Sequence, residues 1–295
     1  MPHTHTPFRY PGGKTQLAKF VQHTIEINHM VSPIYCEPFC GGAGVAVELL
    51  LGRKIDAIIL NDFDICIYSV WNAILNDTDH LLQRIYDTPV NMDTWHTQHH
   101  IYEEFKVAGE YSIELAFATF FLNRTNMSGI ITGGPIGGLT QKGTYKLDCR
   151  YNKETLEKKI LDIAAAREHI QLYHMDAVNL IRSILVHQDP SRLFVFFDPP
   201  YYQQGKKLYK NAFNDEDHIA LANAIREMNA FKWILTYDNH HRIPEIYQGV
   251  QPMWYRLQYM ANKKRAELEL FLHNPKTTVE SYDKVFFDQN ISLAV

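Results

Sequence analysis

The sequence lacks the features that would place it in several common classes of protein. It has 4 cysteines among 295 residues and no C-x-x-C pair, so we expect neither a disulfide framework nor a zinc ribbon. Its N-terminal residues form no basic-then-apolar leader, and no run approaches the ~18 apolar residues of a membrane span. The formal net charge of -4 shows no basic excess, so any binding of nucleic acid depends on a local positive face. These absences predict a reduced, soluble protein of the cytoplasm that does not associate with a membrane.

Two patterns of binding residues are present but incomplete. "GGKT" (12–15) resembles the end of a phosphate-binding loop, but Phe8 stands where such a loop carries its first glycine, and no strand precedes it. This excludes a nucleoside triphosphatase of that type. His96, His99 and His100 have the spacing of metal ligands on a helix, but no carboxylate or cysteine partner is placed beside them. We interpret them as an exposed helix face and expect no metal.

Short apolar runs that end in an acid recur along the chain, and amphipathic stretches separate them. This alternation of strand and helix predicts an α/β fold with a mostly parallel sheet covered on both faces. Two further runs near 253–260 and 267–273 lie close together and predict an antiparallel hairpin at the sheet edge. The acid-terminated runs are "IYCEPF" (34–39), "AIILND" (57–62), "IQLYHMD" (170–176), "LFVFFD" (193–198) and "KWILTYD" (232–238).

One long interval breaks the alternation. Between the second and third runs the sequence has helical patterns, a glycine-rich loop, "SGIITGGPIGG" (128–138), and then a charged helix. We interpret this interval, 67–163, as a helical insertion domain. Residues 1–66 and 164–295 then form the catalytic domain around the sheet.

Ligands of an open parallel sheet bind beyond the carboxyl ends of its strands, and the residues there are unusual. "EPFCGGAG" (37–44) places a glycine cluster between a strand and a helix, so that backbone can approach a ligand at the helix N-terminus. Asp62, at the end of the next strand, has the place of an acid that binds a ribose diol, although an acid there is also typical of a helix cap. Each pattern is weak alone, and together they favour a nucleoside-containing cofactor.

The most informative stretch is "LFVFFDPPYY" (193–202), a buried strand followed by an acid, two prolines and two tyrosines. The amino nitrogen of adenine is a poor nucleophile because its lone pair is delocalised into the ring. Two acceptors can draw its N–H bonds out of the ring plane, and we expect these to be the Asp198 carboxylate and the Pro199 carbonyl. Pro200 restricts the preceding residue to extended geometry, which fixes that carbonyl. Tyr201 offers a ring on which an extruded base can lie.

Five segments, in this order, resemble those of the Dam-like (D12 class, alpha group) DNA adenine-N6 methyltransferases. They are "FRYPGGK", "EPFCGGAG", "NDFD", "FFLNRTNMSGI" and "FFDPPYY", and the resemblance covers nearly the whole chain. It implies a Rossmann-like sheet that binds S-adenosyl-L-methionine, with the helical insertion as the target-recognition domain. It also implies base flipping in double-stranded DNA and direct transfer of the methyl group to adenine N6, without a metal. The recognised bases, and whether a cognate restriction endonuclease exists, are left open.

The resemblance further implies roles for individual residues. The residues implied to bind the cofactor are Tyr10, Lys14, Glu37, Phe39, Gly41, Gly42, Gly44, Asp62, Asp176 and Asp198. Those implied to act on the target base are Asp198, Pro199, Pro200 and Tyr201. Those implied to contact DNA are Asn123, Arg124, Arg150, Tyr151, Lys153, Lys264 and Arg265.

Other functions remain open from the sequence alone. RNA adenine, cytosine N4 and the amide of a protein glutamine also present an exocyclic amine to a methyltransferase. The glutamine-modifying family carries asparagine in place of Asp198 and lacks a long insertion after the second strand. A DNA-binding module with a silent methyltransferase core is a further alternative, against which the intact Asp198, Pro199 and Tyr201 argue.

Overall fold

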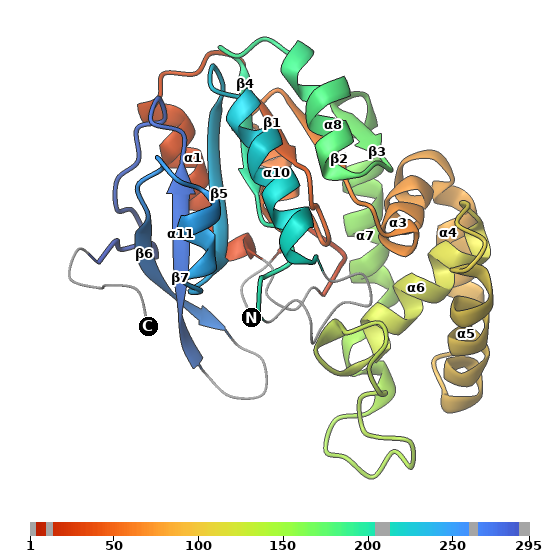
Figure 1. The fold of residues 1–295 in the computed structure, drawn as a ribbon. Coiled ribbons are helices and arrows are strands. Elements are labelled where there is room, and N and C mark those ends of the chain that lie inside the picture. The colour runs from red at the N-terminus through yellow and green to blue at the C-terminus, as the bar shows by residue number, and fades with distance from the viewer. Residues whose placement is uncertain (1–3, 10–13, 204–212, 260–264, 289–295) are drawn as a thin grey trace.

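The computed structural model describes residues 4–9, 14–203, 213–259 and 265–288 of the chain (Figure 1). Its centre is a seven-stranded sheet. The strands are β1 (Ile34–Glu37), β2 (Ala57–Asn61), β3 (Ile170–Tyr173), β4 (Leu193–Phe197), β5 (Lys232–Asp238), β6 (Met253–Tyr259) and β7 (Arg265–His273). Each predicted run forms a strand, and the last two form the predicted antiparallel hairpin.

The order of the strands is β3-β2-β1-β4-β5-β7-β6, and all pairs are parallel except those of β7. The order reverses between β1 and β4, so the chain leaves the carboxyl ends of these two strands in opposite directions. In open α/β sheets a ligand crevice forms at such a reversal. The glycine-rich turn after β1 and the "DPPYY" loop after β4 therefore flank the place where a ligand is expected.

Helices pack on the two faces of the sheet and form the insertion (Figure 1). Short 3₁₀ turns join several of them, and in the described ranges no helix is both long and apolar enough to cross a membrane. The α-helices are α1 (Ala18–Ile27), α2 (Gly44–Leu51), α3 (Ile65–Asn76), α4 (Thr78–Asp87), α5 (Met92–Phe105), α6 (Ile113–Thr125), α7 (Lys153–Ala164), α8 (Ala177–Ser183), α10 (Asp215–Glu227) and α11 (Arg242–Ile246). The 3₁₀ turns are η1 (Lys14–Leu17), η2 (Met127–Gly129), η3 (Leu147–Arg150), η4 (Arg167–His169) and η5 (Leu185–His187).

Alternate side chains of the central strands enter two separate cores. On β4, Phe194 and Phe196 pack into the core shared with α1, α2 and α3, whereas Val195 and Phe197 pack into the core shared with α8 and α10. All five residues of β4 are buried, as a parallel strand covered on both faces requires. This explains why the sequence shows a continuous apolar run rather than an alternating one.

The insertion consists of helices α3 to α7, as the helical patterns predicted. Polar side chains cap four of these helices: Asp64, Asn91, Ser112 and Asn152 each accept a backbone N–H in the first turn of α3, α5, α6 and α7. Helix α6 lies against α3, α4 and α5, and its apolar residues join the same core as α1 and one sheet face. The division of the chain into two domains stays a prediction.

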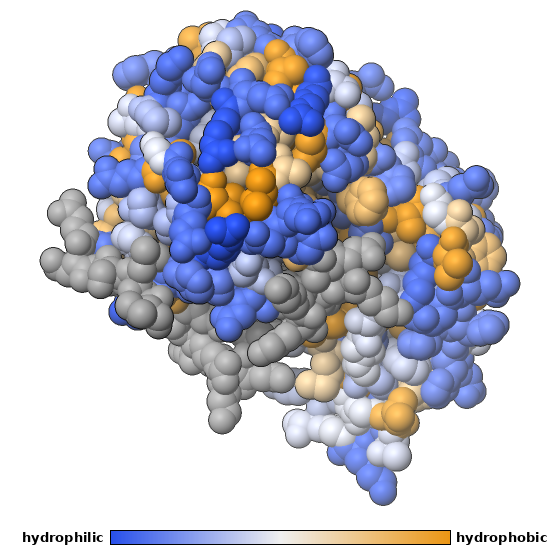
Figure 2. All heavy atoms as spheres, in the orientation of Figure 1, coloured by the Kyte–Doolittle hydropathy of each residue, from blue (hydrophilic) through white to orange (hydrophobic). Residues whose placement is uncertain are grey.

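Two segments extend past the carboxyl ends of the parallel strands. Asp238, the last residue of β5, pairs with Glu269, so the residues of β7 before Glu269 project beyond β5 together with their partners on β6. In Figure 1 the loop between η2 and η3 projects from the same end of the molecule as this hairpin. The face in Figure 2 is mostly hydrophilic, with hydrophobic residues in small separate groups. The expected ligand site thus lies between the hairpin and the insertion.

Candidate active site

Asp198 follows β4 at the point where the strand order reverses. Its Oδ1 accepts a hydrogen bond of 2.6 Å from the Thr236 hydroxyl on β5 and lies 3.8 Å from Lys14 Nζ. The side chain is 28% exposed, so the carboxylate remains accessible to a substrate. Desolvation raises the pKa of Asp198 to about 6; Lys14 and the Thr236 hydrogen bond oppose this rise, and the charge of Glu269 adds to it.

The "DPPYY" loop is anchored at its C-terminal end. Pro199 and Pro200 have no backbone N–H, so neither can donate a hydrogen bond that anchors the loop. Beyond them, the N–H groups of Tyr202 and Gln203 donate to the two oxygens of the Asp238 carboxylate, each at 2.9 Å. Asp238 is buried at the end of β5. The Asp238 carboxylate therefore fixes the C-terminal end of the loop that begins with Asp198.

The two tyrosines of this loop contact different neighbours. The Tyr202 hydroxyl donates to Asp215 at 2.9 Å, and Arg242 holds the same carboxylate with hydrogen bonds of 2.9 and 2.7 Å. The Tyr201 hydroxyl accepts a hydrogen bond from Lys14, whose ammonium also lies 5.0 Å from the Tyr201 ring centroid. Tyr201, the predicted stacking residue, is thus fixed on the side of Lys14.

The glycine-rich turn after β1 is closed by hydrogen bonds to its backbone. Gly41 and Ala43 have positive φ angles of 45° and 42°. The Gly41 N–H donates to the Asp62 carboxylate at 2.8 Å, and the Trp71 indole donates to the Gly41 carbonyl at 2.8 Å. Desolvation raises the pKa of Asp62 to about 7, and the neighbouring charge of Asp64 adds to this. The structure therefore brings two predicted cofactor residues, Gly41 and Asp62, into direct contact.

Two other glycines of the turn contact the N-terminal segment. The Gly42 carbonyl accepts a hydrogen bond of 2.6 Å from the Thr6 hydroxyl. A Cβ on Gly44 would lie 1.9 Å from Thr15 Oγ1 and 3.1 Å from Thr15 Cβ, so a larger residue would force Thr15 of η1, the turn that carries Lys14, to move. Close packing of the two segments thus accounts for the glycine at position 44.

The remaining predicted cofactor residues have different environments. Glu37 is buried and accepts hydrogen bonds of 3.0 Å from both the Tyr35 hydroxyl and the Ala46 N–H, and desolvation raises its pKa to about 8. Asp176 caps α8 through hydrogen bonds from two backbone N–H groups at 2.9 and 3.2 Å. Phe39 is half-buried. Tyr10 lies outside the described residues.

Phe63, next to Asp62, was not singled out from the sequence. Its ring is 60% exposed at the end of β2, close to the tilted ring of His174 at 6.4 Å. An exposed phenylalanine ring beside an acid that is predicted to bind ribose is a surface on which a planar base can stack. The motif "NDFD" contained this residue, but only the structure shows that its ring is exposed.

Asn123, predicted to contact DNA, is instead buried inside the protein. Its amide accepts the Arg9 N–H at 2.9 Å and donates to the carbonyls of Arg9 and Gly129 at 2.8 and 2.9 Å. Gly129 is needed there, because its Cβ would lie 2.0 Å from the Arg9 carbonyl oxygen. Asn123 therefore joins the N-terminal segment to the insertion and offers no polar atom to DNA in this structure.

Tyr151 and Lys153 also contact the protein rather than forming a free surface. Tyr151 is buried, with its ring 5.4 Å from that of Phe121. Lys153 Nζ donates to the carbonyls of Tyr86 and Thr88 at the end of α4, at 2.6 and 3.1 Å. Both stabilise the packing of the insertion.

A group of cations joins the insertion to the N-terminal segment. Arg124 donates to the carbonyls of Arg150 and Pro7 at 2.9 and 3.1 Å, and Lys159 donates to the Thr6 carbonyl at 3.1 Å. Desolvation, with the charge of Arg9, lowers the pKa of Arg124 to about 10. These cations join the two segments, and a contact of Arg124 or Arg150 with DNA stays a prediction. Lys264 lies outside the described residues, as does the side chain of Arg265.

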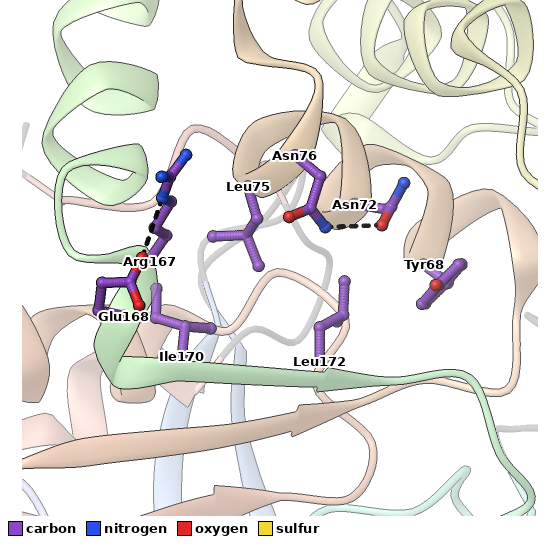
Figure 3. Close-up of a pocket in the computed structure, with 8 residues that line it drawn as sticks. All are labelled: Tyr68, Asn72, Leu75, Asn76, Arg167, Glu168, Ile170 and Leu172. Atoms are coloured by element: carbon purple, nitrogen blue, oxygen red, sulfur yellow. Dashed lines mark hydrogen bonds and ion pairs between the residues drawn. The ribbon is translucent and has the colours of Figure 1, made fainter.

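A cavity of about 540 Å³ lies away from these residues, between α3 and the edge strand β3 (Figure 3). Its walls include Asn72 and Asn76, which share a hydrogen bond of 2.9 Å, and the ion pair of Arg167 with Glu168 at 3.3 Å. No predicted site residue lines it. The cavity is therefore not the site to which the strand ends point.

Residues 10–264 match the model of the D12 class N6 adenine-specific DNA methyltransferases. The chain belongs to this family. It is 25% identical over 255 residues to the type II methyltransferase M.CviBI of Paramecium bursaria Chlorella virus NC1A, covering 85% of this chain and 89% of that protein. Two structures of the rRNA methyltransferase AviRa from Streptomyces viridochromogenes are each 14% identical, cover 91% of this chain and 88% of theirs, and have TM-scores of 0.41 and 0.40.

Family membership confirms the predicted enzyme class, an adenine-specific DNA methyltransferase, and the predicted Rossmann-like α/β fold. It favours DNA adenine over the other exocyclic amines that the sequence left open. In the described part of the chain, no three His, Cys, Asp or Glu side chains are grouped to hold a metal ion.

In this adenine-specific DNA methyltransferase, Glu269 of β7 is a buried acid that was not predicted from the sequence to belong to the site. Its side chain is 1% exposed, and both oxygens lie 2.8 Å from Lys14 Nζ. The Tyr201 hydroxyl donates to Oε1 at 2.7 Å, and the Tyr255 hydroxyl donates to Oε2. Glu269 thus connects η1, the "DPPYY" loop and β6 beneath Asp198.

Proposed function

We propose that this protein transfers the methyl group of S-adenosyl-L-methionine to N6 of an adenine that it takes out of double-stranded DNA. The observation that carries the proposal is how the two carboxylate oxygens of Asp198 are contacted. Thr236 and Lys14 both contact Oδ1, and among the described residues no hydrogen bond reaches Oδ2. A fixed, accessible carboxylate with one free oxygen is suited to accept an N–H of the target amine.

The residues at the strand ends fit the cofactor by the chemistry of their side chains. Lys14 carries a positive charge for a carboxylate, Asp62 can accept hydrogen bonds from a ribose diol, and the exposed Phe63 ring can stack on the adenine of the cofactor. The bound cofactor supplies an activated methyl group on a sulfonium. Gly41, in its positive-φ conformation, allows the backbone to approach this ligand closely.

The protein's contribution to the reaction is to orient the target amine. Asp198 Oδ2 and the Pro199 carbonyl accept its two N–H bonds, which concentrates the nitrogen lone pair on the side of the methyl group. Thr236 prevents the carboxylate from rotating, and Asp238 holds the loop that carries the carbonyl. Alignment and a preorganised charge distribution account for the acceleration, without a covalent enzyme intermediate.

Incubation of the protein with labelled S-adenosyl-L-methionine and duplex DNA, followed by nucleoside analysis, tests this proposal. We expect label in N6-methyladenine. Label in N4-methylcytosine, in RNA or in protein glutamine would contradict it, as would DNA that acquires no label. Sequencing the methylated DNA would give the recognised bases and show whether a cognate restriction endonuclease is worth seeking.

The pKa of Asp198 predicts a pH dependence of turnover. The group acts as an acceptor only when it is ionised, and its pKa is raised to about 6. Turnover at saturating substrate should therefore fall as the pH decreases through about 6, whereas an ordinary aspartate would keep the rate constant to about pH 4. A single-turnover pH profile of methyl transfer measures this. A rate that stays constant down to pH 4.5 would contradict it.

A further inference from the structure

The placement of Lys14 between two carboxylates is an unusual feature of the site. Its ammonium lies 2.8 Å from both oxygens of Glu269 and 3.8 Å from Asp198 Oδ1. The lysine side chain is 5% exposed and that of Glu269 1%, so solvent screens their attraction little. Glu269 is the nearer partner and binds through both oxygens. Lys14 is therefore held on the Glu269 side and makes no hydrogen bond with Asp198.

Tyr201 is held by the same acid. Its hydroxyl accepts from Lys14 and donates to Glu269 at 2.7 Å, which closes a triangle of hydrogen bonds. The Tyr255 hydroxyl, from the neighbouring strand β6, donates to the other oxygen of Glu269. The position of Glu269 is fixed in turn because it pairs directly with Tyr255 on one side and Asp238 on the other.

We propose that Glu269 is a positioning residue of the methyl transfer, which keeps Lys14 from closing onto Asp198 and so leaves the Asp198 carboxylate free for the target amine. The inference rests on the proposed role of Asp198. Without the charge of Glu269, Asp198 is the nearest carboxylate to the buried ammonium. Lys14 then moves onto Asp198 and occupies the acceptor, and the Tyr201 hydroxyl no longer donates to a charged carboxylate.

Glu269 also acts on Asp198 through charge. Its negative charge raises the pKa of Asp198, whereas the positive charge of Lys14 lowers it. When the charge of Glu269 is removed and Lys14 moves closer, the pKa of Asp198 is therefore expected to fall. Among the residues that the structure describes, the charged or titratable groups around Asp198 include Lys14 of η1, Tyr35 and Glu37 of β1, Tyr201 of the loop, Tyr237 of β5 and Glu269 of β7.

The variant Glu269→Gln tests the inference, because it removes the charge and keeps the shape. We expect single-turnover methyl transfer to fall about 10²-fold, as a misplaced reacting group predicts. The fall in rate on acidification should also move to a lower pH than in the wild type. Tyr255→Phe removes one hydrogen bond to Glu269 but leaves the charge of Glu269 in place. The acid limb of its pH profile, which is the fall in rate on acidification, should therefore stay at the wild-type pH. Glu227→Gln, at an exposed ion pair on α10, should keep the wild-type rate and profile.

Two results would overturn the inference. One is a Glu269→Gln variant with the wild-type rate and pH profile. The other is a loss of rate no larger than that of Tyr255→Phe with an unshifted acid limb, since Glu269 would then serve packing alone. If Glu269→Gln does not fold, Glu269→Asp, which keeps the charge on a shorter side chain, should lower the rate without moving the limb; a moved limb contradicts the charge argument.

A crystal structure of Glu269→Gln separates this inference from the proposed function. Lys14 Nζ within hydrogen-bond distance of Asp198 supports it, and Lys14 remaining beside residue 269 overturns it. This readout needs no activity. An inactive wild-type protein would refute the proposed function alone, whereas an active wild type with an undisturbed Lys14 in the variant would refute the positioning role alone.

Discussion

Asp198→Ala is expected to lower methyl transfer about 10³-fold, the scale reported for removal of one preorganised electrostatic partner of a reacting group. The alanine leaves the target amine without the acceptor that draws its lone pair out of the ring. Binding of S-adenosyl-L-methionine should stay close to that of the wild type, because Lys14 keeps its contacts with Glu269 and Asp62 is unchanged. Single-turnover kinetics and calorimetric titration of the cofactor measure the two quantities.

Asp56→Ala is a matched control for this variant. Asp56 is an exposed aspartate whose contact with Arg192 is 3.6 Å, so its loss should change neither quantity measurably. Asp198→Asn supplies a second comparison, since it keeps an oxygen acceptor but not the charge. Methyl transfer by Asp198→Ala at the wild-type rate would refute the role of this carboxylate, and equal losses of rate and cofactor affinity would make it a binding residue.

The sheet could be predicted from the sequence because its parallel strands are buried on both faces. Runs such as "LFVFF" of β4 have no polar interruption, and each ends in an acid or a turn at the carboxyl edge. The crossing order of the strands also places the "EPFCGGAG" and "DPPYY" segments next to each other. That order is known only from the structure; the sequence predicted Gly41, Asp62 and Asp198 as site residues because each follows a strand at the carboxyl edge of the sheet.

Glu269 could not be predicted, because its local pattern suggests a solvent-facing residue. In "AELELFLH" the glutamates alternate with leucines, as they do on a strand with one face in water. The lysine and tyrosine that bury Glu269 come from η1 and the "DPPYY" loop, far away in the sequence. Thr236 and Asp238 of β5 were missed for the same reason, since their partners lie in the loop that follows β4.

In the insertion, polar residues that were predicted to contact DNA have hydrogen-bond partners within the protein, and their contact with DNA stays a prediction. A lysine that caps the carbonyls at the end of a helix and a lysine that binds a phosphate have the same sequence signature. Lys153 is of the first kind in this structure, and Asn123 binds backbone on both sides of its amide. Only the burial and the partners of each side chain distinguish these roles.

Lys14→Met should lower the free energy of unfolding by about 3 kcal/mol, because it removes the ammonium that lies 2.8 Å from both oxygens of the buried Glu269 carboxylate. Glu269 would still accept from the hydroxyls of Tyr201 and Tyr255, but it would lose the positive charge of Lys14 in a site that is almost closed to water. Adding Glu269→Gln in the same chain removes the buried charge and should restore much of the stability. Urea unfolding followed by tryptophan fluorescence measures all three proteins.

The two single variants should differ in stability, and this difference tests the arrangement around Lys14. Glu269→Gln alone should cost less stability than Lys14→Met alone, because Lys14 can still pair with Asp198, 3.8 Å away, whereas Lys14→Met takes away the ammonium that lies 2.8 Å from the buried Glu269 carboxylate. Lys19→Met is the matched control, an exposed lysine whose contact with Asp283 is 4.0 Å, and should have little effect. A double variant less stable than Lys14→Met would show that the charge of Glu269 is satisfied without Lys14, and the buried pair would then not organise the site.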